Sequence, residues 1–244
     1  MRPTRPQGRT VSGYDDFAAA YAEENEASLL NAYYERPAML GLAGDVRGRR
    51  ILDAGCGAGP LFAALRERGA EVAGFDASAG MLELACRRLG PNADLRQADL
   101  GEPLPYQDEE FDDIVCSLAL HYLRDWAEPL QEFRRVLEPG GRLLLSVNHP
   151  LAYALDEGRY FPIVEWPMEV ELAGTPATLM TWHRPLHAMV EDFTTAGFRI
   201  TSISEPPVSD DTPEELLRQP DGRPIPRRFV SFLFFALERV ADQP

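Results

Sequence analysis

The chain has 244 residues, of which 45% are apolar, and its formal net charge is −15. This composition predicts one soluble globular domain rather than disorder, and no stretch reaches the roughly 18 apolar residues that a membrane span needs. All basic residues are arginines, and they are scattered along the chain. A nucleic-acid partner is disfavoured because it would require a phosphate-neutralising basic patch.

The segments before and after the central part of the chain are predicted to cover it. Tyr14, Phe17 and Tyr21 follow one another at spacings of three and four, which favours a helix. The ten residues that open the chain are interpreted as a frayed cytoplasmic tail rather than a signal peptide. We expect a single domain over 1–244, which divides into a helical cap at 11–40, a core at 41–148, a lid insertion at 149–184 and a C-terminal part of the sheet at 185–244.

Short apolar runs alternate with amphipathic stretches from Arg49 onward, which is typical of βαβ units around a parallel sheet. The predicted strands are RRILDAG, EVAGFD, DLRQADL, FDDIVCSLAL and GRLLLSVNH. Predicted helices lie between them, including one that Ser78 caps and one from Trp126 to Leu137. The lid insertion contains a predicted hairpin, MEVELAGTPATLMTW. A helix (LHAMVEDFTTAGF) and two strands (FRITSISE and RRFVSFLFFALERV) complete the chain.

The most specific motif is LDAGCGAGP, Leu52 to Pro60, between a predicted strand and a predicted helix. Its glycines let the backbone turn tightly and approach a ligand, while the helix N-terminus favours an anionic group. The dinucleotide fingerprint G-x-G-x-x-G would need a third glycine where Pro60 stands. Asp76 closes the next strand and is placed to accept hydrogen bonds from two ribose hydroxyls.

At these residues the chain resembles the class I S-adenosylmethionine (SAM)-dependent methyltransferases, and among them the small-molecule enzymes. The motifs that carry the resemblance follow one another in register: LDAGCGAGP, GFDAS, QADL, FDDIVCSLALHYLRD and LEPGGRLLLSVNHP. The resemblance implies a Rossmann-like α/β fold with helices on both faces of a seven-stranded sheet. Its implied strand order is 3-2-1-4-5-7-6, with the last strand antiparallel. SAM is then expected at the carboxyl ends of strands 1 and 4.

The resemblance also implies roles for individual residues. The glycine loop would contact the methionine end of SAM, and Asp53 would either contact its ammonium group or brace the turn. Asp99 would bind the adenine amino group, whereas Tyr21 and Arg36 from the cap would bind the SAM carboxylate. The complete predicted cofactor-binding set is Tyr21, Arg36, Asp53, Gly55, Cys56, Gly57, Asp76, Ala77, Met81, Asp99, Leu100 and Ser117.

Two histidines are candidate catalytic bases on the acceptor side. His121 follows the fourth core strand and His149 ends the fifth. Either could take a proton from a hydroxyl or amine, and either could instead be a structural, hydrogen-bonded residue. Aromatic residues of the insertion, including Trp166 and Trp182, could line an acceptor pocket or form a small core of their own. The sequence indicates no cluster of metal ligands, and no metal is expected.

The predicted function is transfer of the SAM methyl group to an O, N or C atom of a small, partly apolar or aromatic acceptor in the cytoplasm. Positioning for in-line displacement is the main task of such an enzyme. Two alternatives remain open: a nucleic-acid or protein methyltransferase, and a SAM-binding protein of this fold that transfers no methyl group. No oligomeric state is predicted.

Overall fold

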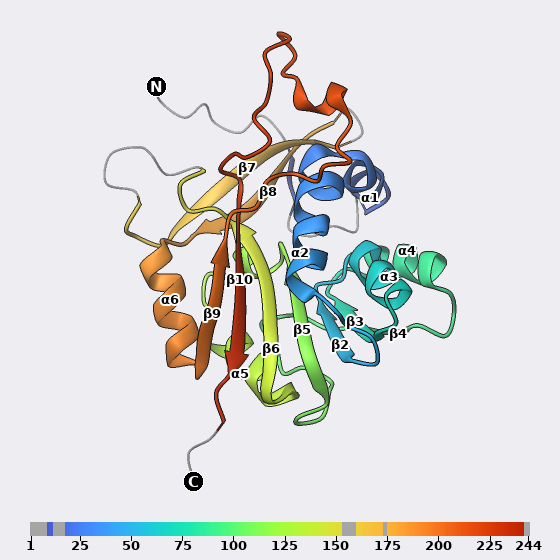
Figure 1. The fold of residues 1–244 in the computed structure, drawn as a ribbon, viewed down its shortest axis with the longest axis vertical. Coiled ribbons are helices and arrows are strands. Elements are labelled where there is room, and N and C mark those ends of the chain that lie inside the picture. The colour runs from blue at the N-terminus through green and yellow to red at the C-terminus, as the bar shows by residue number, and fades with distance from the viewer. Residues whose placement is uncertain (1–8, 12–17, 153–159, 173–174, 242–244) are drawn as a thin grey trace.

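A seven-stranded mixed sheet forms the centre of the protein, as a computed structural model shows for residues 9–11, 18–152, 160–172 and 175–241 (Figure 1). Its order is β4-β3-β2-β5-β6-β10-β9. β10 runs antiparallel to both of its neighbours, while the strands from β4 to β6 are parallel. The predicted order and the antiparallel last strand are confirmed. The strand bounds are β2 Arg50–Ala54, β3 Glu71–Asp76, β4 Asp94–Gln97, β5 Phe111–Ser117, β6 Leu137–Asn148, β9 Phe198–Ser204 and β10 Phe232–Arg239.

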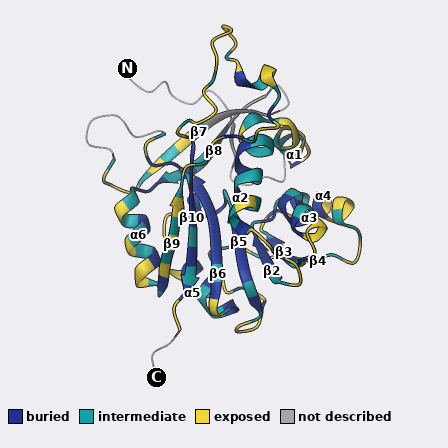
Figure 2. Ribbon diagram, viewed as in Figure 1, coloured by how far each residue is buried: buried dark blue, intermediate teal, exposed yellow. Residues whose placement is uncertain are grey.

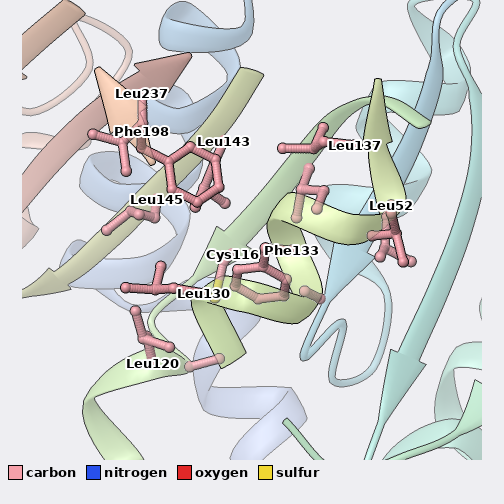
Figure 3. Packing of buried hydrophobic residues seen from close by; sticks show 14 of the residues in the cluster. Leu52, Cys116, Leu120, Leu130, Phe133, Leu137, Leu143, Leu145, Phe198 and Leu237 are labelled. Carbon is pink, nitrogen blue, oxygen red and sulfur yellow. The ribbon is translucent and has the colours of Figure 1, made fainter. Parts of the chain in front are cut away.

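Helices cover both faces of this sheet, and each face has its own hydrophobic cluster. One cluster joins the sheet to α5 through side chains such as Leu130 and Phe133 (Figure 3). The same cluster includes Phe193 of α6. The other joins it to α2 and α3 through side chains such as Met39 and Leu65. Burial is deepest along the central strands, whereas the outer faces of α4 and α6 are exposed (Figure 2). The helix bounds are α1 Ala18–Ala27, α2 Arg36–Ala43, α3 Pro60–Glu67, α4 Ala79–Leu89, α5 Ala127–Val136 and α6 Leu186–Thr195.

A separate three-stranded sheet, in the order β1-β8-β7, lies over the carboxyl ends of the central strands (Figure 1). The predicted hairpin of the insertion is confirmed, with β7 at Val164–Leu172 and β8 at Thr175–His183. The expectation of a frayed N-terminal tail was wrong for Arg9 and Thr10, and that of a helical cap was wrong for Val11, because Arg9–Val11 forms β1 and pairs in parallel with β8. Tyr14, Phe17 and the first two residues of the hairpin turn lie outside the described residues.

The cap continues after α1 as a π-helical turn, Asn31–Glu35, that leads directly into α2. Glu35, Met39 and Ala43 recur at a spacing of four and are all buried. They therefore form one stripe of the helix against the sheet, and Glu35 is the charged member of that stripe. Among the described helices, none combines the length and the apolar character that crossing a membrane would demand.

The strand that follows α5 begins earlier than predicted. β6 is continuous from Leu137, although the predicted helix included Leu137 and the predicted strand began only at Gly141. Pairing with β5 shifts register between Phe111 and Asp113, so the residues around Gly140 bulge without ending the strand. Gly140 has a φ of +80°, which a residue with a side chain rarely adopts.

The carboxylate of Asp113 on β5 links this strand to Arg142 on β6 and to Arg49, which directly precedes β2. This carboxylate is fully buried and accepts hydrogen bonds from Arg49 and Arg142, with Arg142 Nε at 2.7 Å and Nη2 at 2.8 Å. Because both guanidinium groups share one buried carboxylate, removal of Asp113 would leave two cations without their partner.

Candidate functional site

The glycine loop after β2 is anchored to the neighbouring strand by its own backbone. The N–H groups of Gly55 and Cys56 both donate to the carbonyl oxygen of Phe75 at 2.9 Å. Gly55 has a φ of +74°, and a Cβ at this position would lie 2.7 Å from the Cβ of Ala119. Glycine is therefore required here both by the backbone conformation and by the close approach of the chain that follows β5.

Asp76 at the end of β3 connects the glycine loop to the next helix. Its Oδ2 accepts a hydrogen bond from the N–H of Gly57 at 2.8 Å, and its Oδ1 accepts one from the N–H of Ser78 at 2.9 Å. Ser78 in turn caps α4 by accepting from the N–H of Met81. Each carboxylate oxygen has further acceptor capacity, so these bonds orient the carboxylate and leave it able to bind hydroxyl groups.

A cavity of about 690 Å³ opens above the carboxyl ends of β2, β3 and β5. This volume lies within the range of small-molecule and cofactor sites. The glycine loop and the strand ends form one side, the cap helix α1 and the π-helical turn form another, and Leu179 and Met180 of β8 close it from the hairpin. All of the predicted cofactor-binding residues line this cavity: Tyr21, Arg36, Asp53, Gly55, Cys56, Gly57, Asp76, Ala77, Met81, Asp99, Leu100 and Ser117.

Asp53 carries a buried carboxylate at the base of the cavity. The residue is 1% exposed, and neither of its oxygens accepts a hydrogen bond of normal geometry from the residues that the structure describes, although the backbone N–H of Phe62 is near enough to favour the ionised carboxylate. Burial, together with the negative charges of Glu35 and Asp76, raises the pKa of Asp53 to about 8. A buried acceptor without a donor is costly, so this group is set to receive a hydrogen-bonding, positively charged ligand.

Ion pairs connect the cap helix α1 to α4 and to Arg36, beside the cavity. Glu26 of α1 pairs with Arg88 of α4 and lies 3.5 Å from Nη1 of Arg36. Arg36 also donates to the carbonyl oxygen of Asn25 at 3.3 Å, and Arg88 donates to the carbonyl oxygen of Ala58 at 2.9 Å. These contacts join the cap to both α4 and the glycine loop, so the cap forms part of the site.

Comparisons with known proteins agree with this geometry. Residues 52–145 match the model of a methyltransferase domain. The solved structure of an S-adenosylmethionine dependent methyltransferase from Mesorhizobium loti is 30% identical, with a TM-score of 0.65, and the superposition covers 83% of this chain and 96% of that one. The chain belongs to the class I SAM-dependent methyltransferases.

Sequence relatives within this methyltransferase family carry names of quinone-modifying enzymes. A demethylmenaquinone methyltransferase from Clavibacter sepedonicus is 34% identical over 145 residues, which cover 58% of this chain and 59% of that protein. A ubiquinone biosynthesis O-methyltransferase from Alkalilimnicola ehrlichii is 33% identical over 115 residues, 45% of this chain and 47% of that protein. The aligned part thus spans about half the length of these two relatives.

SAM is the cofactor of this methyltransferase family, and the cavity fits it on three counts. The volume is sufficient, the glycine loop leaves its backbone open to a ligand at Gly57, and Asp53 offers buried acceptors that lack donors. Met81 is almost fully buried at the start of α4, and it lines the cavity together with Asp99 and Leu100. Their predicted contacts with the adenine ring stay predictions.

The two histidines predicted to be bases are not among the residues that line the cavity of this methyltransferase. His121 is 4% exposed, and burial lowers its pKa to about 3, which makes it a weak base. His149 lies 2.9 Å from the carboxylate of Glu205 through Nε2, and its Nδ1 accepts from the N–H of Leu151. Both ring nitrogens of His149 are therefore engaged, which favours a structural role for this residue, whereas Nδ1 of His121 is buried without a hydrogen-bond partner in the described part of the chain. The predicted role of each histidine as a base stays a prediction.

Several residues that line the cavity were not among the predicted site residues, and Glu35 and Leu118 are the two that matter most for the argument. Glu35 lines the cavity from the cap, and Leu118 follows β5 with a φ of +48°, a strained conformation for a branched side chain. The signal for Glu35 was present, since a lone carboxylate stands on the apolar stripe with Met39 and Ala43. Nothing in the sequence indicates the backbone conformation of Leu118.

Proposed function

We propose that the protein transfers the methyl group of SAM to a small, partly apolar acceptor that binds at the hairpin side of the cavity. The observation that carries this proposal is the division of a single cavity between two kinds of wall. The wall at the strand ends is polar and acidic, with Asp53, Asp76 and Asp99. Another part of the lining is mostly apolar, and it comes from the segment after β5 and from β8: Leu118, Ala119, Tyr122, Leu123, Leu179 and Met180.

An apolar wall beside the cofactor favours acceptors with an apolar or aromatic body. The names of the two quinone-modifying relatives are consistent with such an acceptor. Methylation of nucleic acid is disfavoured because, among the described residues, Arg36 is the only arginine that lines the cavity. Its positive charge is already paired with the carboxylate of Glu26. Binding of nucleic acid would need several available cations near the site.

SAM supplies an activated methyl group on a sulfonium. Bound SAM would supply this methyl group by displacement at carbon: the bond between sulfur and the methyl carbon would break with its electron pair going to sulfur, an electron pair of the acceptor atom would form the new bond, and the acceptor's proton would pass to solvent. The protein holds the two partners in line and excludes water, and positioning of this kind can contribute about 7–11 kcal/mol. Excluding water is a role for the cap and for the β7–β8 hairpin, which close the cavity from two sides.

The test is incubation of the protein with methyl-labelled SAM and a panel of small acceptors, namely reduced quinones, phenols and heteroaromatic amines, followed by mass spectrometry. A labelled product that forms with the wild type and is lost in Asp76→Ala supports the proposal. Leu179→Trp places a larger side chain on the apolar wall and so reduces the space for the acceptor. This variant should raise the KM for the acceptor, while its affinity for SAM stays within about twofold of the wild type. Label that enters RNA or protein, but no small molecule, would overturn the proposal.

A further inference from the structure

Glu35 brings a second carboxylate to the part of the cavity where Asp53 lies. The residue is 4% exposed and lines the cavity from the π-helical turn. Its Oε1 accepts hydrogen bonds from the hydroxyls of Ser117 at 2.7 Å and of Ser146 at 2.6 Å. Its Oε2 accepts none from the described part of the chain, so one oxygen is fixed by the sheet and the other remains available to a ligand.

No guanidinium group contacts this pair of carboxylates within the described residues. Arg36 lies on the same cavity wall, but its side chain is directed to Glu26 and to the backbone of Asn25. Burial is the main reason why the pKa of Glu35 is raised, and the two serine hydroxyls and the charge of Arg36 oppose this effect. Two buried carboxylates without a cation in direct contact are costly to ionise, and the cost falls when a positively charged group enters between them.

We propose that Glu35 is a cofactor-positioning residue that, together with Asp53, forms a receptor for the α-ammonium group of SAM. An ammonium group has three donors. The two oxygens of Asp53 and Oε2 of Glu35 are acceptors that the described residues leave open, so donors and acceptors match in number. The inference rests on SAM as the cofactor and is independent of the acceptor that receives the methyl group.

Binding at this receptor is coupled to proton release. Near pH 7 the Asp53 carboxyl holds its proton in the ligand-free protein, and an ammonium ion favours the ionised form. The other ionisable groups facing the pair are Asp76, Arg36 and the thiols of Cys56 and Cys116. Burial raises the pKa of both thiols, so they stay neutral in this range. SAM affinity should therefore rise with pH from 6 to about 8.

Calorimetry with three ligands distinguishes binding of the ammonium group from a general effect of Glu35 on the affinity for the cofactor. SAM and S-adenosylhomocysteine both carry the ammonium group, whereas 5′-methylthioadenosine lacks the whole amino-acid part. Glu35→Gln and Asp53→Asn should each weaken SAM and S-adenosylhomocysteine by about tenfold or more, and leave 5′-methylthioadenosine within about twofold. Glu132→Gln is the control: this part-buried carboxylate holds Leu104 and Arg135 outside the cavity and should not alter any of the three affinities.

Proton release gives a measurement that needs no variant. Titrations of the wild type in buffers of different ionisation enthalpy should show nearly one proton released per SAM at pH 7 and none for 5′-methylthioadenosine. The proposal is overturned if no proton is released with SAM, or if Glu35→Gln leaves SAM affinity unchanged. It is also overturned if this variant weakens 5′-methylthioadenosine as much as SAM, or weakens SAM alone, which would assign Glu35 to the sulfonium.

Discussion

Replacement of Asp76 by alanine should weaken SAM binding more than it weakens the fold. The carboxylate is already oriented by the N–H groups of Gly57 and Ser78, at 2.8 and 2.9 Å, and is placed to accept two ribose hydroxyls. Hydrogen bonds to a charged acceptor contribute about 1.5–3 kcal/mol each. Even if water replaces part of this energy, Asp76→Ala should cost about 2 kcal/mol or more of binding free energy, which is about 30-fold in Kd.

The same variant also removes the partner of two backbone N–H groups, so an indirect effect through the loop has to be separated from loss of the ribose contact. Calorimetry with 5′-methylthioadenosine and its 2′-deoxy analogue makes this distinction. The wild type should bind the deoxy analogue about tenfold more weakly, while Asp76→Ala should bind both ligands nearly equally. If the variant still discriminates between the two ligands as the wild type does, Asp76 does not bind the ribose and the reasoning is refuted.

Three further perturbations test other parts of the structure. In Gly55→Ala the new Cβ would lie 2.7 Å from the Cβ of Ala119, and the residue would have to adopt a φ of +74°. We therefore expect a lower midpoint of thermal unfolding and a weaker affinity for SAM. If neither quantity changes, the geometry described for the loop is contradicted. Asp113→Ala removes the carboxylate that Arg49 and Arg142 share. Both arginine side chains are partly exposed and keep a backbone partner, so we expect the free energy of unfolding to fall by about 1.5–3 kcal/mol in urea titrations. A loss below about 0.5 kcal/mol would show that these ion pairs add little. Asp53 keeps its proton up to about pH 8 in the folded protein but only to about pH 4 when unfolded, so the free energy of unfolding should fall as pH rises between these values. Urea titrations at pH 5, 7 and 9 should show that this free energy falls less steeply with pH in Asp53→Asn than in the wild type.

The fold was predictable because its signals are local and repeated. Alternating apolar and amphipathic segments specify the βαβ units, and Ser78 and Gly90 mark the two ends of one helix as expected. β1 was not predictable, because Arg9–Val11 is a three-residue strand that forms only by pairing with β8, far away in the sequence. Such a strand depends on tertiary contacts and not on propensity.

The cofactor side of the site was predictable for a related reason. Its residues stand at strand ends and in the glycine loop, where the backbone conformation follows from the residue type. Arg36 was placed correctly on the cavity wall, yet its ion pair with Glu26 could not be foreseen, since the two residues belong to separate helices that meet only in the folded cap. The role of each residue toward SAM remains a prediction.

The acceptor side was harder to predict because a single strained residue decides which side chains face the cavity. Leu118 adopts a φ of +48° directly after β5, and the chain then enters a short 3₁₀ helix, Leu120–Tyr122. Successive residues of a 3₁₀ helix point about 120° apart. Tyr122 therefore faces the cavity while His121 is turned into the protein. The sequence places the two residues side by side after β5, and only this backbone geometry separates the one that lines the cavity from the one that does not.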